Sequence, residues 1–217
     1  MAATGLTLAL LQRGEAEAAR DLGEDTLRRG RRVLGTDHTR TLWAATALTA
    51  ALDRLGQAEA TRTLGDDTLR RLRLVFGPDH ATSLSAAAAV THALAQLGWA
   101  EAARALGEDT LQRCRRTFGP DSLVTLWAAG ALTLALAQLG EAGAARDLGE
   151  DTLRRCRAVF GPNHLITLLA AAALIFTLAQ LGQAGAARDL GEDTLRRCRA
   201  VFNPNHLNTL TAAAALI

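Results

Sequence analysis

The chain has 217 residues, of which 24 are basic and 22 acidic, so its formal net charge is only +2. This balance, with acidic residues often placed four positions before Arg, indicates ion-paired helix faces and gives no reason to expect a nucleic-acid partner. Aromatic residues make up 4% of the sequence, with no Tyr and four Pro, which favours helices over sheet. We therefore expect an all-α protein that does not bind nucleic acid.

A 42-residue repeat runs along the whole chain. The tetrapeptide Gly-Glu/Asp-Asp-Thr starts at positions that are always 42 residues apart: Gly23, Gly65, Gly107, Gly149 and Gly191. Each repeat also contains a Leu-Gly turn such as Leu55-Gly56 and a second breaker such as Gly77-Pro78. Two breakers in each repeat predict two helices in each repeat.

The first predicted helix of a repeat, helix A, runs from about His38 to Leu55, and helix B runs from about Gln57 to Phe76. Apolar residues spaced three and four positions apart form one face of helix A: Leu42, Ala45, Leu48, Leu52 and Leu55. The recurring positions of helix B are Ala60, Leu64, Thr68, Leu69 and Phe76. A mid-helix Gly costs about 1 kcal/mol relative to Ala, so the recurring Gly65 position predicts a close approach between helices.

These features resemble the tetratricopeptide repeat, in the 42-residue form of kinesin light chains and of the sensor arms of bacterial NB-ARC-type signalling ATPases. The resemblance covers the whole chain and is most specific from Asp193 to Leu210, which is similar to the bacterial subgroup. It implies a right-handed α-solenoid of stacked antiparallel helix pairs. We expect one domain, residues 1–217, with about five repeats and incomplete helices at both ends.

Two positions depart from the family pattern. The aromatic residue that follows the Leu-Gly turn in the family is Ala here, at Ala58, Ala100, Ala142 and Ala184. The helix A Asn that helps to hold a bound peptide backbone in relatives is also Ala, at Ala47, Ala89, Ala131, Ala173 and Ala215. The usual way of clamping a peptide is therefore not expected.

Residues that could carry chemistry follow the same repeat. Cys114, Cys156 and Cys198 are each one repeat apart, and packed helices lie about 8–10 Å from each other, so we expect buried free thiols. His38, His80, His164 and His206 are equally separated and are expected to cap helix A or to pack across the turn, without sharing a metal. The predicted N-caps of the A helices are Asp79, Asp121, Asn163 and Asn205.

No catalytic, cofactor or metal site emerges, since the sequence offers no paired carboxylates, no nucleophile with a base and no phosphate-binding loop. We predict that the protein is not an enzyme. The start of the chain lacks a secretory signal pattern, so the cytoplasm is the default expectation, with an extracellular location as the alternative. Residues 165–181 are apolar but align with more polar segments of other repeats, and predict a buried helix rather than a membrane span.

A second stripe on helix A, opposite the first face, varies between repeats and is rich in large apolar residues. We predict that it forms a protein-interaction surface together with the C-terminal end: Trp43, His92, Trp127, Leu134, Leu165, Leu169, Phe176, Leu216 and Ile217. The alternative is that neighbouring repeats bury the stripe themselves. Both ends of the sequence fall within helix A, which indicates either a part of a longer array or ends that meet other subunits.

The functional hypothesis is a non-catalytic scaffold for protein–protein association. Its expected partner is another copy of the chain, added head-to-tail through the solenoid ends and the apolar stripe into a homo-oligomer or filament. The alternative is the peptide- or protein-sensing arm of a bacterial NB-ARC-type signalling or defence protein.

Overall fold

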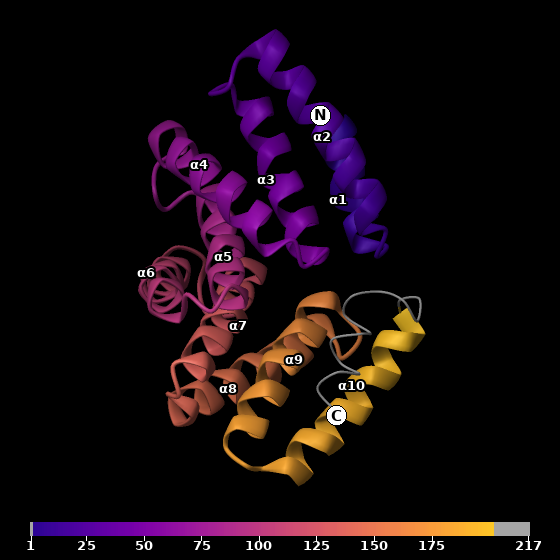
Figure 1. Ribbon diagram of the computed structural model, residues 1–217, viewed down its shortest axis with the longest axis vertical. Helices are drawn as coiled ribbons and strands as arrows, with labels where there is room; N and C mark the ends of the chain where they lie inside the picture. The colour runs from indigo at the N-terminus through magenta and orange to yellow at the C-terminus, as the bar shows by residue number, and fades with distance from the viewer. Residues whose placement is uncertain (1, 202–217) are drawn as a thin grey trace.

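The protein forms ten helices and no strand within residues 2–201, the part of the chain that its computed structural model describes (Figure 1). In chain order these are α1 (Ala2–Gln12), α2 (Ala16–Leu34), α3 (Thr39–Arg54), α4 (Ala58–Phe76), α5 (Ala81–Gln96), α6 (Ala100–Phe118), α7 (Leu123–Gln138), α8 (Ala142–Phe160), α9 (Leu165–Gln180) and α10 (Ala184–Val201). The predicted bounds of helices A and B agree with α3 and α4 to within one residue at each end.

The helices form two layers of a solenoid, as predicted. Odd-numbered helices correspond to helix A of each repeat, and consecutive A helices contact each other along the chain. Each of the first four even-numbered helices packs between the A helix before it and the A helix after it. Figure 1 shows the pairs following an arc from α1 and α2 to α9 and α10. The A helices therefore supply the inner wall of the solenoid.

Glycine ends each A helix in the same way. Gly56 has a φ of 66°, a left-handed conformation that an L side chain rarely adopts. The N–H of Gln57 donates to the carbonyl of Leu52 at 3.0 Å, and the N–H of Gly56 donates to the carbonyl of Asp53 at 3.0 Å. This pattern reverses the chain within two residues and holds α3 antiparallel to α4.

The predicted N-caps Asp79, Asp121 and Asn163 are wrong by one residue. The caps are His38, His80, Ser122 and His164, and the Nδ1 atoms of the three histidines accept a backbone N–H at 3.2–3.3 Å. The expected role of these histidines is thereby confirmed, and His80 also stacks on Phe76 with ring centroids 4.7 Å apart. Asn205 and His206 lie outside the described residues.

Instead of capping helices, Asp79, Asp121 and Asn163 bind Arg side chains of the next repeat. The guanidinium of Arg113 donates to Asp109 of its own helix at 2.8 Å and to Asp79 of the preceding turn at 3.0 Å. The same arrangement recurs around Arg71, Arg155 and Arg197. Partly exposed ion pairs of this kind are worth up to about 1 kcal/mol each. They fix the register between repeats more than they add stability.

The core lies where helix B meets two A helices. Leu42, Ala45, Leu48 and Leu52 are buried, which confirms the predicted face of helix A except at Leu55, which is half-buried. Of the positions predicted on helix B, Leu69 is buried, whereas Leu64 is only half-buried and Ala60 is exposed. The buried face of helix B therefore runs through Thr61, Gly65, Thr68, Leu69 and Leu72, and Leu64 lies at its edge.

Close approach explains the recurring glycine inside helix B. A Cβ built on Gly65 would lie 2.5 Å from Cγ2 of Val90, which is fully buried on α5. Cβ atoms on Gly107 and Gly149 would also meet neighbouring side chains at 3.0–3.1 Å.

Cys114, Cys156 and Cys198 are buried free cysteines, as predicted. None of the helices between residues 2 and 201 combines the length and the apolar character that a membrane crossing requires.

Candidate functional site

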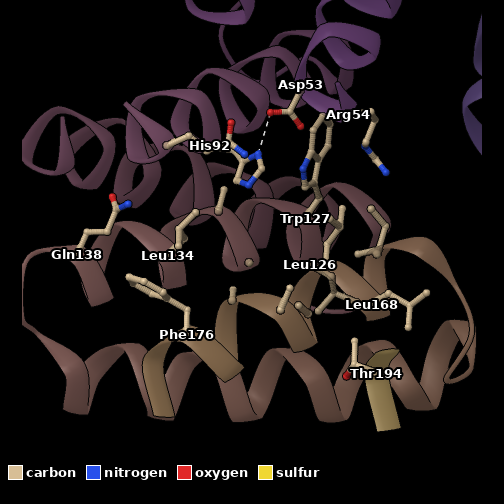
Figure 2. Close-up of a pocket in the computed structure, with 18 residues that line it drawn as sticks. Asp53, Arg54, His92, Leu126, Trp127, Leu134, Gln138, Leu168, Phe176 and Thr194 are labelled. Carbon is tan, nitrogen blue, oxygen red and sulfur yellow. Dashed lines mark hydrogen bonds and ion pairs between the residues drawn. The ribbon is translucent and has the colours of Figure 1, made fainter. Parts of the chain in front are cut away.

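A cavity of about 410 Å³ lies on the inner wall of the solenoid (Figure 2). It is lined by the A helices of four consecutive repeats, α3, α5, α7 and α9, with one residue, Thr194, from α10. Its volume falls in the range of about 300–1,000 Å³ that is typical of ligand-binding sites. Its apolar wall includes the large side chains of Trp127, Leu134, Leu169 and Phe176.

The cavity brings together five of the nine residues predicted as an interaction surface: His92, Trp127, Leu134, Leu169 and Phe176. The first four are half-buried, and Phe176 remains 36% exposed. Trp43 is half-buried on α3 but does not line the cavity, and Leu165 packs with Leu168 and Cys198 instead. Leu216 and Ile217 lie outside the described residues.

A polar cluster forms one side of the cavity, where α3 ends against α5. The imidazole Nδ1 of His92 lies 2.7 Å from Oδ1 of Asp53, and the Asp53 residue is only 3% exposed. Burial lowers the pKa of His92, but the charge of Asp53 and the hydrogen bond to it together outweigh burial and the opposing charge of Arg54. The pKa of His92 is therefore raised above its ordinary value of 6.5.

Arg54, the last residue of α3, is a cation with incomplete hydrogen bonding. Its Nε and Nη1 atoms are buried and have no hydrogen-bond partner among the described residues. Burial lowers the pKa of this guanidinium, and the charge of Asp53 only partly opposes that effect. Two causes lower the pKa of His164, which lies on the turn before α9: burial is the larger, and the positive charge of Arg54 is the smaller.

A second incompletely bonded group lies away from Arg54. The side-chain Oε1 of Gln138, at the end of α7, is buried without a hydrogen-bond partner in the described structure. Figure 2 shows Gln138 and Arg54 at opposite sides of the lining residues, with Trp127 and Leu134 between them. The cavity thus has one unsatisfied polar group on each side, with His92 and the apolar side chains of Trp127 and Leu134 between them.

Sequence reasoning missed Asp53, Arg54 and Gln138. The signal for the first two was present, because the positions that correspond to Asp53 are Leu11, Ala95, Ala137 and Ala179, and those that correspond to Arg54 are Gln12, Gln96, Gln138 and Gln180. A charged pair that replaces an apolar residue and Gln in a single repeat marks a local specialisation. Within residues 2–201, no group of His, Cys, Asp and Glu side chains has an arrangement that could hold a metal ion.

Comparison with known families agrees with the resemblance seen in the sequence. Two tetratricopeptide repeat models match the chain, one over residues 92–158 and the other over residues 1–40, 41–82 and 176–208. No curated protein matches the chain in sequence.

Several solved structures share the fold at low sequence identity. Nearly identical TPR-like repeats assigned to a kinesin light chain of Podosopora anserina align with a TM-score of 0.64 at 18% identity, covering 92% of this chain and 94% of theirs. BtubC (BKLC) of P. vanneervenii aligns with a TM-score of 0.63 at 14% identity, covering 93% and 81%. PlcR of Bacillus thuringiensis, in complex with the peptide PapR7 and DNA, has a TM-score of 0.73 at 11% identity, covering 99% and 72%.

Proposed function

The chain belongs to the tetratricopeptide repeat family, and we propose that it is a non-catalytic scaffold whose inner cavity binds an apolar peptide segment of a partner protein. The observation that supports this most is the cavity wall of Trp127, Leu134, Leu169 and Phe176. Large apolar side chains clustered in a concave site contribute most of the binding energy in protein interfaces. The PlcR structure, which has the same fold, contains a bound peptide.

The mode of binding differs from one that grips a peptide backbone. Ala131 and Ala173, at the positions where relatives have the backbone-holding Asn, both line the cavity. Methyl groups at these positions offer no hydrogen bonds, so affinity has to come from burial of apolar side chains, at about 25 cal/mol per Å² of apolar surface. We therefore expect the bound segment to be selected by its bulky side chains.

Self-association remains a second candidate, supported by large apolar side chains that stay exposed on the A helices, Leu123 at 44% and Phe176 at 36%. In this proposal, the chain forms one solenoid of about five repeats over residues 1–217, and copies stack head-to-tail. A sensor arm of an NB-ARC-type protein would use the same cavity for its ligand. Light scattering of the purified chain separates stacking, which gives a mass that rises with concentration, from binding of a peptide by a monomer.

Selection from a random peptide library tests the main proposal. The wild-type chain is expected to enrich peptides with bulky apolar residues, and Trp127→Ala and Phe176→Ala should weaken their binding by about tenfold or more. Leu74→Ala is the matched control, because Leu74 is 82% exposed on α4 and lies outside the cavity. Failure of the wild type to enrich any peptide, or equal binding by all variants, would reject the inner cavity as the binding site.

A further inference from the structure

Arg54 carries a charge that no protein group neutralises at close range. Within residues 2–201, no carboxylate lies within 4 Å of its guanidinium, and Nε and Nη1 are buried without partners. Other unpaired Arg side chains of the chain, such as Arg28 and Arg40, are exposed and can be hydrated by water. Arg54 as a residue is half-buried, and a charge that is partly removed from water without a partner is costly, which makes Arg54 a candidate for pairing with a ligand.

The nearest candidate counter-ion is engaged elsewhere. Asp53 precedes Arg54 in the sequence, but its carboxylate accepts a hydrogen bond from His92 at 2.7 Å. This pairing directs the carboxylate toward α5, and Arg54 remains among the residues that line the cavity. The charged pair is therefore arranged so that the positive member stays free.

The surroundings of Arg54 specify the rest of the ligand. Figure 2 shows Trp127 next to Arg54, whereas Leu134 and Phe176 lie farther along the apolar wall, so that Arg54 is at the border of this wall. A matching ligand carries its negative charge at one end and an apolar body behind it. The Ala residues of the wall provide no donors for peptide groups, so this ligand needs no peptide backbone.

We propose that the cavity binds a small organic carboxylate with an apolar body, whose carboxylate pairs with Arg54 and whose body packs against Trp127 and Phe176. The planar guanidinium can pair with a carboxylate through its charge and through hydrogen bonds from the nitrogens that face the ligand. A ligand of this class fits a cavity of about 410 Å³, and it would occupy the same wall as the partner segment. The proposal goes beyond the scaffold function and does not require it.

The experiment uses octanoate as an aliphatic probe and 4-phenylbutanoate as an aromatic one, titrated into the full chain and followed by calorimetry. The neutral analogue 1-octanol keeps the apolar body of octanoate without its charge. We expect at least one carboxylate to bind about tenfold or more tightly than 1-octanol, because hydrogen bonds to a charged partner in a buried site are worth that factor.

Variants of a single residue then locate the effect. Arg54→Gln introduces the residue that the other repeats have at this position, so the fold should be retained, and it should weaken carboxylate binding by about tenfold to a hundredfold with little change for 1-octanol. Arg54→Lys should keep part of the preference because it keeps the charge. Arg40→Gln, which removes an exposed charge from the same helix, is the matched control and should bind as the wild type does.

The outcomes are distinct from those of the peptide selection. Carboxylate binding that depends on Arg54 supports this proposal whether or not the library yields a peptide. The proposal is overturned if neither probe binds, if 1-octanol binds as tightly as octanoate, or if Arg54→Gln and Arg40→Gln weaken carboxylate binding to the same extent. In the last case the carboxylate responds only to the overall charge of the surface.

Discussion

Asp53 and His92 form a hydrogen-bonded pair, 2.7 Å apart, although 39 residues separate them in the sequence. The pair joins the end of α3 to the last turns of α5 and replaces the apolar residues that other repeats have at these positions. It links the two helices at the wall of the cavity, next to Arg54.

This pair predicts a strongly coupled double-mutant cycle. His92→Leu, which introduces the residue found at Leu134, leaves the buried Asp53 carboxylate unpaired and should lower the free energy of unfolding by about 2–4 kcal/mol. Asp53→Ala should cost about 1–3 kcal/mol. The double variant restores the pattern of the other repeats, so it should recover most of the loss. Chemical denaturation of the four proteins measures the coupling, and additive losses would show that the pair contributes nothing as a unit.

The raised pKa of His92 predicts how stability depends on pH. A group whose pKa is higher in the folded state binds its proton more tightly there, so its contribution is fully present below the unfolded value of about 6.5. That contribution is lost as the pH rises through the folded pKa. Unfolding free energies of the wild type and of the Asp53→Ala/His92→Leu variant should therefore diverge most at low pH, and a constant difference from pH 5.5 to 8.5 would contradict the assignment.

Gly65 and Gly143 predict opposite responses to the same substitution. Gly65→Ala gains about 1 kcal/mol of helix propensity but places a Cβ 2.5 Å from Cγ2 of the buried Val90, an overlap that should cost about 1–3 kcal/mol and outweigh the gain. Gly143, near the start of α8, has nothing within 4 Å of a built Cβ. Gly143→Ala should be neutral or stabilising by up to about 1 kcal/mol. Thermal unfolding of both variants checks the sign of each effect.

The cysteines predict low reactivity in the folded protein. Burial raises the pKa of Cys156 to about 12 and that of Cys114 and Cys198 to about 11, so very little thiolate exists at neutral pH. A thiol reagent such as iodoacetamide should label these residues slowly in native protein and rapidly in denaturant. Rapid labelling of the native protein at pH 7 would mean that the helix packing around these cysteines opens readily.

Much of the fold could be predicted from the sequence because the repeat places its breakers at fixed intervals. The Leu-Gly turn and the Gly-Pro turn determined the helix bounds to within a residue. The N-cap prediction was wrong by one residue because Asp79 and His80 are adjacent and both can accept a backbone N–H. Only the structure shows that His80 caps the helix while the Asp79 carboxylate accepts a hydrogen bond from Arg113.

The candidate site was predictable only in part. The apolar stripe follows from helical spacing within each repeat, so Trp127, Leu134, Leu169 and Phe176 were found. The cavity depends on how the solenoid curves, which brings the end of α3 toward α9, and a small rotation between each pair of repeats decides that curvature. Asp53 and Arg54 acquire their roles only through this arrangement.

The fluorescence of Trp127 tests the central claim, that the inner cavity is the binding site. The chain has three tryptophans, and a Trp43→Phe/Trp99→Phe variant leaves Trp127 as the sole reporter on the cavity wall. Titration with a library-selected peptide should give a saturable shift of its emission to shorter wavelength, with the dissociation constant found by calorimetry. If calorimetry records binding while the emission of Trp127 stays constant, the ligand binds elsewhere and the account of the cavity is wrong.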